Sequence, residues 1–205
     1  MTKRECIIAG AGEWPKNFKI KKGSFIIAAD GGYDALRKNG IRPHLLLGDM
    51  DSISAIPENI AVARFPMRKD DTDISLAIKL CVKWGFKNIA LVGITGSRYD
   101  QFAASLQLMA RNAKKGVSIR AELPGQRVYA LHNGTLILNK LKKNKVLSVL
   151  APYDIAHGVS IKNCSYELNN AVLSNEFPLG VSNLGIGESP VISVNNGTLL
   201  IFVEN

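Results

Sequence analysis

The chain has 205 residues, of which 46% are hydrophobic and 21% charged, and its 26 Lys and Arg against 17 Asp and Glu give a formal net charge of +9. A chain of this size and composition can bury a substantial core, which excludes an intrinsically disordered protein. No apolar run reaches the roughly 20 residues of a membrane span, and the first residues lack the pattern of a secretory signal. The cysteines lie far apart without a CxxC motif, which predicts reduced core thiols in a cytoplasmic protein with no membrane partner.

Short apolar runs that end in small or polar residues predict buried strands in the first half of the chain, at 6–12, 25–32, 44–52 and 88–97. The spacing of apolar residues predicts two helices, over 74–85 and 101–116. The apolar positions are Ile74, Ala77, Ile78, Leu80 and Cys81 in the first helix, and Phe102, Leu106, Met109 and Ala113 in the second. Strands that alternate with helices predict a mostly parallel sheet covered on both faces, with ligands beyond the carboxyl ends of its strands.

The pattern changes near residue 124. From there the sequence consists of short strand-like runs broken by Asn, Gly and Pro, and no strong helical pattern remains. This is typical of an antiparallel sandwich or barrel. The sequence therefore predicts two domains, an α/β domain over 1–124 and an all-β domain over 125–205.

The acidic residues of this basic chain gather where predicted strands end or a predicted helix begins: Asp30, Asp49, Asp51, Asp70, Asp71, Asp73 and Asp100. Asp49 and Asp51 are two residues apart, and carboxylates so close repel each other unless a cation joins them. Oxygen ligands without His or Cys favour Mg²⁺ over zinc. In the GDMDS segment a metal is favoured over helix capping, whereas Asp30 fits either role and Asp70 or Asp71 is well placed to cap the next helix.

Glycines and one arginine accompany these acids. Gly31 and Gly32 follow Asp30 and allow a backbone to approach phosphate closely. Arg98 has the planar group that suits phosphate oxygens, although it could equally pair with Asp100 and brace the loop. A dinucleotide-binding motif is incomplete because Pro15 stands where its third glycine belongs. The residues alone indicate a Mg²⁺-dependent enzyme that acts on a polyphosphate, with the acceptor left open.

The ordered motifs of the chain resemble those of the thiamine pyrophosphokinase family over nearly its whole length. The motifs are ADGG at 29–32, GDMDS at 48–52, KDDTD at 69–73 and GSRYDQ at 96–101, followed by an all-β tail with Ser182 and Asn183. The resemblance implies transfer of the β,γ-pyrophosphoryl group of ATP to the hydroxyl of thiamine, with AMP as the second product. It also implies a Rossmann-like α/β domain that binds ATP and Mg²⁺, a β-sandwich domain for thiamine binding and dimerisation, and a homodimer whose active sites lie at the subunit interface.

The resemblance further implies a role for each motif residue. The residues expected to hold Mg²⁺ are Asp30, Asp49, Asp51 and Asp73. Those expected to bind the ATP phosphates are Asp30, Gly31, Gly32, Asp70, Thr72 and Arg98. Asp100 is expected to hold Arg98 or to receive the hydroxyl proton, and the catalytic set is Asp49, Asp51, Asp73, Arg98 and Asp100. Thiamine is expected to meet Gln101, Ser182 and Asn183.

The chain departs from the family pattern at three positions. Met50 replaces the usual Phe, Gln101 the commoner His, and Ser97 a Gly, which bears on loop geometry. Phe177 and Tyr153 are candidates for stacking on thiamine, although a structural role is the more usual one for such residues.

Three other functions are compatible with parts of the sequence. The first is a Mg²⁺-dependent pyrophosphokinase that acts on another alcohol, such as a pterin. The second is a sensor that binds thiamine or nucleotide without catalysis, which the retained motif acids disfavour. The third is a nucleic-acid-binding module that uses the positive charge. Aromatic residues make up only 7% of the chain and are not interleaved with the basic runs, so no nucleic-acid partner is expected.

Overall fold

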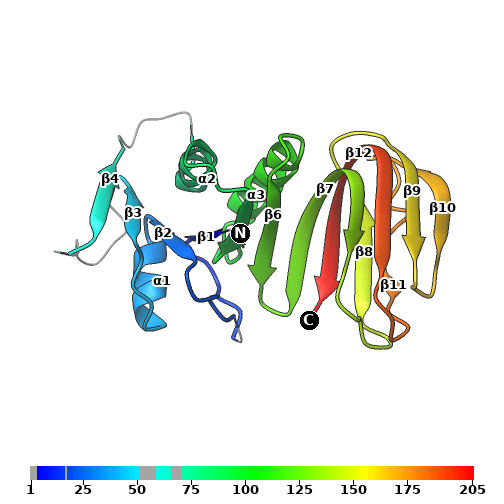
Figure 1. Cartoon of the computed structure of the whole chain (residues 1–205), viewed down its shortest axis with the longest axis horizontal. Helices are drawn as coiled ribbons and strands as arrows, with labels where there is room; N and C mark the ends of the chain where they lie inside the picture. Colours follow the sequence, from blue (N-terminus) through cyan, green and yellow to red (C-terminus); the bar gives the residue numbers. More distant parts are fainter. Residues whose placement is uncertain (1–3, 17, 51–58, 66–70) are drawn as a thin grey trace. The chain divides into compact units, whose positions relative to one another are not determined.

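The computed structural model describes residues 4–16, 18–50, 59–65 and 71–205 (Figure 1). The chain divides into two compact units. The first comprises Met1–Leu108 with Ile119–Pro124, and the second comprises Met109–Ser118 with Gly125–Asn205.

The first unit is built on a sheet with the strand order β6-β5-β1-β2-β3-β4. The strands from β5 to β4 pair in parallel, as the alternation of strands and helices predicted. Their bounds are β1 Glu5–Ala9, β2 Phe25–Ala29, β3 Leu45–Gly48, β4 Ala61–Arg64, β5 Asn88–Val92 and β6 Ser118–Leu123. The chain passes from β1 to β2 on one side and returns to β5 on the other, so the strand order reverses at β1. Ligands in open α/β sheets bind at such a point, beyond the carboxyl ends of the strands.

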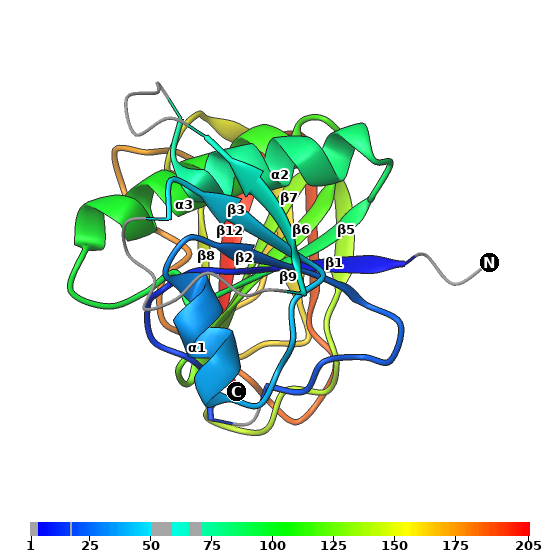
Figure 2. The ribbon, with the colours of Figure 1, turned by 90° about the vertical axis from the view of Figure 1, so that its left-hand side faces the viewer.

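Helices lie on both faces of this sheet. Figure 2 shows α1 (Gly32–Lys38) on one face and α2 (Asp73–Lys83) on the other. Ile7 of β1 belongs to the same buried cluster as Leu36 of α1, while Cys6 faces α2 and its Sγ lies 2.9 Å from Sγ of Cys81. Because successive strand residues are buried on opposite faces, β1, β2, β3 and β5 are apolar or glycine at every position except the first residues of β1 and β5. The prediction of reduced, buried cysteines is confirmed for all three.

The predicted helices are confirmed with shifted bounds and altered faces. In α2 the buried residues are Ser75, Ala77, Ile78 and Cys81, so Ile74 and Leu80 are less buried than predicted. The second predicted helix is α3, which runs over Tyr99–Ala113. It is the longest described helix, and none of the described helices is long and apolar enough to span a membrane.

Three elements of the first unit were not predicted. They are α1, β4 and β6. The seven-residue α1 is too short for a periodic apolar pattern, and three of the four residues of β4 are exposed, so neither carries a clear hydrophobic signal.

The second unit consists of antiparallel strand pairs with a core of its own, together with the end of α3. Its strands are β7 Gln126–Ile137, β8 Val146–Leu150, β9 Ala156–Lys162, β10 Leu168–Leu173, β11 Asn183–Leu184 and β12 Val191–Glu204. Residues 125–205, all of them described, contain no helix, as predicted. One edge of β12 pairs with β7, and the other pairs first with β9 and then with β8.

Two long strands replace four short predicted ones. The sequence predicted separate strands at 127–132 and 134–139, divided at Asn133, and at 190–197 and 198–204, divided after Gly197. In the structure β7 and β12 both continue through these points. The register between them shifts between Val194 and Thr198, where β12 forms a bulge. Gly197 has φ +127°, and its N–H donates to Oδ1 of Asn133 at 2.9 Å. The turn-forming residues therefore serve a bulge rather than two chain reversals.

Candidate functional site

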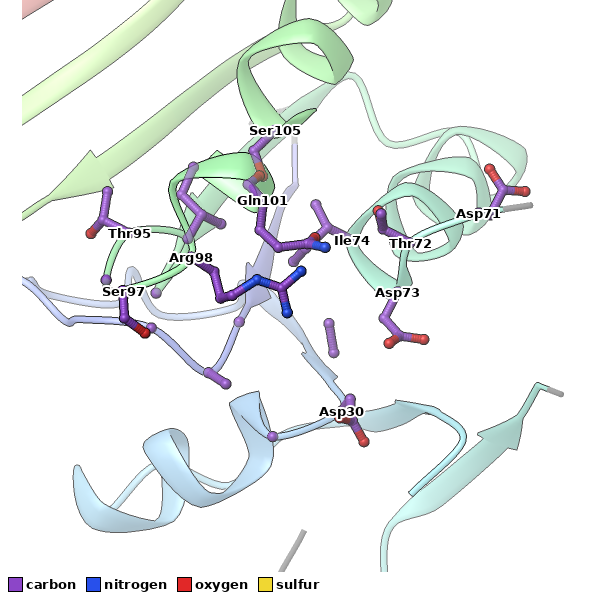
Figure 3. Close-up of a pocket in the computed structure, with 18 residues that line it drawn as sticks. Asp30, Asp71, Thr72, Asp73, Ile74, Thr95, Ser97, Arg98, Gln101 and Ser105 are labelled. Atoms are coloured by element: carbon purple, nitrogen blue, oxygen red, sulfur yellow. The ribbon is translucent and has the colours of Figure 1, made fainter. Parts of the chain in front are cut away.

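A cavity of about 580 Å³ lies in the first unit, beyond the carboxyl ends of β1, β2 and β5. The first turns of α2 and α3 complete its lining (Figure 3). The position is the one at which the strand order reverses. A volume of this size accommodates a small-molecule ligand.

The floor of this cavity is made of backbone. The loop after β1 and the loop after β5 bond to each other, with Gly10 N donating to Val92 O and Gly12 N donating to Gly93 O, each at 2.8 Å. A Cβ at Gly12 would lie 2.9 Å from the oxygen of Gly93 and closer still to that of Thr95. Glycine at this position therefore allows the two loops to meet. Gly10 and Gly12 are the first two glycines of the incomplete dinucleotide-binding motif.

Asp30 follows β2 in a backbone conformation that aspartate rarely adopts. Its φ is +45°, and its N–H donates to the oxygen of Leu47 at 2.7 Å. Its Oδ1 is buried and has no hydrogen-bond partner among the described residues. Asp30 lines the cavity, and a lining residue with a strained backbone and a buried, unsatisfied carboxylate oxygen is typical of a ligand-binding residue.

At the start of α2, Asp71 and Asp73 point in different directions. Thr72 caps the helix, since its Oγ1 accepts from the N–H of Ser75 at 3.1 Å. Asp71 accepts from Oγ of Ser75 at 2.9 Å and pairs with Nζ of Lys79 at 2.6 Å. Figure 3 shows the Asp71 carboxylate turned away from the centre of the cavity and that of Asp73 turned towards Asp30. The cap predicted for Asp70 or Asp71 is provided by Thr72, and Asp71 bonds to side chains instead. Asp70 lies outside the described residues.

Arg98 enters the cavity from the start of α3 and is held by a two-point pair. Its Nε donates to Oδ1 of Asp100 at 2.9 Å, and its second nitrogen donates to Oδ2 at 2.7 Å. These hydrogen bonds raise the pKa of Arg98 and lower that of Asp100 to about 2. Figure 3 shows the guanidinium directed at the space between Asp73 and Asp30. Of the two alternatives left by the sequence, the pair with Asp100 is formed, and contact of Arg98 with phosphate stays a prediction.

The remaining predicted residues of the first unit fall into three groups. Gly31, Thr72 and Gln101 line the cavity with Asp30, Asp73 and Arg98. Gly32 and Asp49 are not among its lining residues, although Asp49 directly follows Gly48, whose backbone lies against Asp30. Asp51 and Asp70 lie outside the described residues.

Ser182 and Asn183 belong to the second unit, so their predicted contact with thiamine stays a prediction. Asn183 is buried, and its amide group bonds to the backbone of Tyr166 in both directions. Ser182 is exposed with φ +62°. Of the two stacking candidates, Phe177 is 66% exposed and Tyr153 38%, so Phe177 in particular is not a packing residue of its own unit.

Thr95 is a lining residue that sequence reasoning passed over. Its Oγ1 is buried and has no hydrogen-bond partner among the described residues. It lies three residues after the end of β5, in the same kind of position as Asp30 after β2. Ile74 and Ser105 also line the cavity, but their place in helical patterns concealed this.

The described residues contain no group of three or more His, Cys, Asp or Glu side chains that could hold a metal. The described part of the site offers Asp30 and Asp73. Their oxygens are the ligand type that Mg²⁺ takes, and Mg²⁺ is commonly held by one or two carboxylates together with water and substrate phosphates.

Comparison with known proteins identifies the family. The family model "Thiamin pyrophosphokinase, catalytic domain" matches residues 18–121. Thiamine pyrophosphokinase of Bacillus subtilis is 27% identical over 184 residues, which cover 85% of each chain. Its crystal structure aligns with a TM-score of 0.84 over 99% of both chains at 25% identity. Thiamin pyrophosphokinase 1 of Caenorhabditis elegans is 24% identical over 196 residues, which cover 89% of this chain and 80% of the relative. The chain therefore belongs to the thiamine pyrophosphokinase family.

Proposed function

We propose that the cavity of the first unit is the place where this chain carries out the thiamine pyrophosphokinase reaction. In this reaction the hydroxyl oxygen of thiamine forms a bond to the β-phosphorus of ATP. The bond from that phosphorus to the oxygen bridging to the α-phosphate breaks, and AMP leaves. The observation that carries the proposal is the convergence of Arg98, Asp30 and Asp73 on one space from three separate elements (Figure 3).

Asp30 and Asp73 would hold Mg²⁺ against the phosphates, together with Asp49 and Asp51 from the segment that follows β3. The unsatisfied Oδ1 of Asp30 supports this role, because a buried carboxylate oxygen without a donor is stabilised by a cation. When bound, the ion would neutralise phosphate charge that otherwise repels the attacking oxygen. We also propose that the first unit is a Rossmann-like domain that binds ATP and Mg²⁺.

Arg98 binds the transferring phosphates, and Asp100 positions it. The two-point pair fixes the plane of the guanidinium, which suits recognition of phosphate oxygens. Because its pKa is held at about 2, Asp100 is too weak a base to take the proton of the thiamine hydroxyl near neutral pH. Of the two roles expected for Asp100, positioning is the one we propose.

Thiamine would contact Gln101 and Ser182. The enzyme would be a cytoplasmic homodimer with its active sites at the subunit interface. Asn183 would act indirectly, because its amide already bonds the backbone of Tyr166 and so fixes the turn that presents Ser182. Phe177 is the better candidate for stacking on the thiamine ring, since its side chain is two-thirds exposed within its own unit.

The test is formation of AMP and thiamine diphosphate from ATP, thiamine and Mg²⁺, with EDTA as the metal control. Asp73→Asn should lower kcat/KM by at least about a hundredfold, as loss of a ligand at a metal site does. Asp71→Asn is the matched control: Asp71 also lines the cavity, but its carboxylate is turned away from the centre and bonds to Ser75 and Lys79. This variant should keep activity within a few-fold. Formation of ADP in place of AMP, or equal losses in both variants, would contradict the proposal.

A further inference from the structure

A second cavity of about 410 Å³ adjoins the first within the same unit. It lies between the loop after β1 and α1. The two cavities share Ala11, Gly12 and Gly31 in their linings. These small residues leave the boundary between the cavities without a bulky side chain, so one elongated ligand can occupy both.

Trp14 lines the second cavity. Its Nε1 lies close to Gly93, a lining residue of the first cavity, since a Cβ at Gly93 would lie only 2.7 Å from Nε1. The indole packs on the core of the unit and makes an edge-to-face contact with Phe18, with ring centroids 6.3 Å apart. The second cavity is therefore lined by an aromatic ring that is already held in place.

The chemical character of the two cavities differs. The first contains the charged groups that suit phosphate and metal, namely Arg98, Asp30 and Asp73. The second combines the indole with the hydrogen-bonding groups of Asp34 and Lys38 on α1 and of Asn39, which follows it. An aromatic wall with a polar rim suits a flat heterocycle that carries hydrogen-bonding edges and a sugar.

We propose that the second cavity holds the purine base and ribose of the nucleotide substrate, with the base packed against Trp14 and the phosphates in the first cavity. This inference rests on the proposed function, because it assigns a place to one part of the same substrate. The phosphate chain would cross from one cavity to the other over Gly12 and Gly31. Trp14 is then a specificity-determining residue that selects a nucleotide over a bare polyphosphate.

The two tryptophans of the chain allow a direct test by fluorescence. Trp84 is 48% exposed and lines neither cavity, so Trp84→Phe leaves Trp14 as the sole indole reporter. In this variant ATP and AMP, each with Mg²⁺, should change the Trp14 emission. Inorganic tripolyphosphate, which has no base, should compete with ATP for binding without causing that change. Equal responses to ATP and tripolyphosphate, or no response while ATP binding is measured by calorimetry, would overturn the inference.

Kinetics give a second test that does not depend on fluorescence. Trp14→Leu should raise KM for ATP about tenfold, as expected when base stacking is lost, while the inhibition constant of tripolyphosphate stays unchanged. Trp14→Phe keeps an aromatic face and should restore most of the affinity, which separates stacking from a folding defect. An unchanged KM in Trp14→Leu, or equal weakening of ATP and tripolyphosphate, would refute the assignment. Failure of AMP formation in the wild type would instead refute the proposed function.

Discussion

Replacement of Asp30 by asparagine should make the ligand-free protein more stable and the enzyme inactive. The buried Oδ1 of Asp30 has no hydrogen-bond partner among the described residues, and its backbone has φ +45°. An unsatisfied buried polar group costs about 1–3 kcal/mol, and more when it is charged. Asparagine tolerates the same φ and keeps the shape, so only the charge is lost. We expect a gain of about 1 kcal/mol in the free energy of unfolding, or about 2–4 °C in the melting temperature.

The order of stability should reverse when Mg²⁺ and ATP are added. A ligand at a hundred times its Kd stabilises a protein by about 2.7 kcal/mol, and only the wild type should gain this in full. Thermal unfolding followed by circular dichroism, with and without Mg²⁺ and ATP, measures both effects, and ATP with EDTA serves as the control. If Asp30→Asn is less stable than the wild type without ligand, the carboxylate has a structural partner. If both proteins gain equally from Mg²⁺ and ATP, Asp30 does not hold the metal. Either result would refute the reasoning.

Three further predictions concern positioning, reactivity and stability. Asp100→Asn should raise KM for ATP without shifting the pH profile of kcat between pH 5 and 9, because a pKa of about 2 keeps Asp100 ionised over this range. If the variant instead lost the acidic limb of the profile, Asp100 would be the base. In the native protein no thiol should react with an aromatic disulfide reagent at pH 8, because all three cysteines are buried and burial raises the pKa of the Cys164 thiol to about 11. In denaturant all three should react. Rapid reaction of any thiol in the native protein would contradict this. Arg120→Met should destabilise the protein by about 2–3 kcal/mol in urea unfolding, because it removes the guanidinium that now pairs with the carboxylates of Glu5 and Glu122. Adding Glu5→Gln and Glu122→Gln should recover most of the loss, and no recovery would show that packing rather than charge is responsible.

The sheet of the first unit and the acids at its edge could be predicted because both carry local signals. Strands buried on two faces are continuously apolar, and the polar residue that follows each run marks the carboxyl end. This signal located Asp30 after β2 and would have located Thr95 after β5. This signal cannot tell which of Asp71 and Asp73 has its carboxylate turned towards the cavity. That depends on the hydrogen bonds of Asp71 to the side chains of Ser75 and Lys79.

What the sequence could not predict depends on partners far along the chain. Asn133 and Gly197 have the composition of turns, but they lie opposite each other on paired strands and form a bulge. Asn183 matches a family motif, yet its amide bonds to Tyr166, seventeen residues away. Trp14 gave no signal of its own, since its position in the second cavity depends on the loops that meet at Gly93.

The backbone floor of the first cavity limits how this enzyme could be redesigned. Because Gly12 and Gly93 press two loops against each other, no side chain can be introduced there to reshape the site, and most substitutions at these glycines would separate the loops. New acceptor alcohols or donor nucleotides would have to be accommodated through the walls. Thr95 and Ile74 are the positions that protein engineering should vary first, since both line the cavity and neither is a glycine.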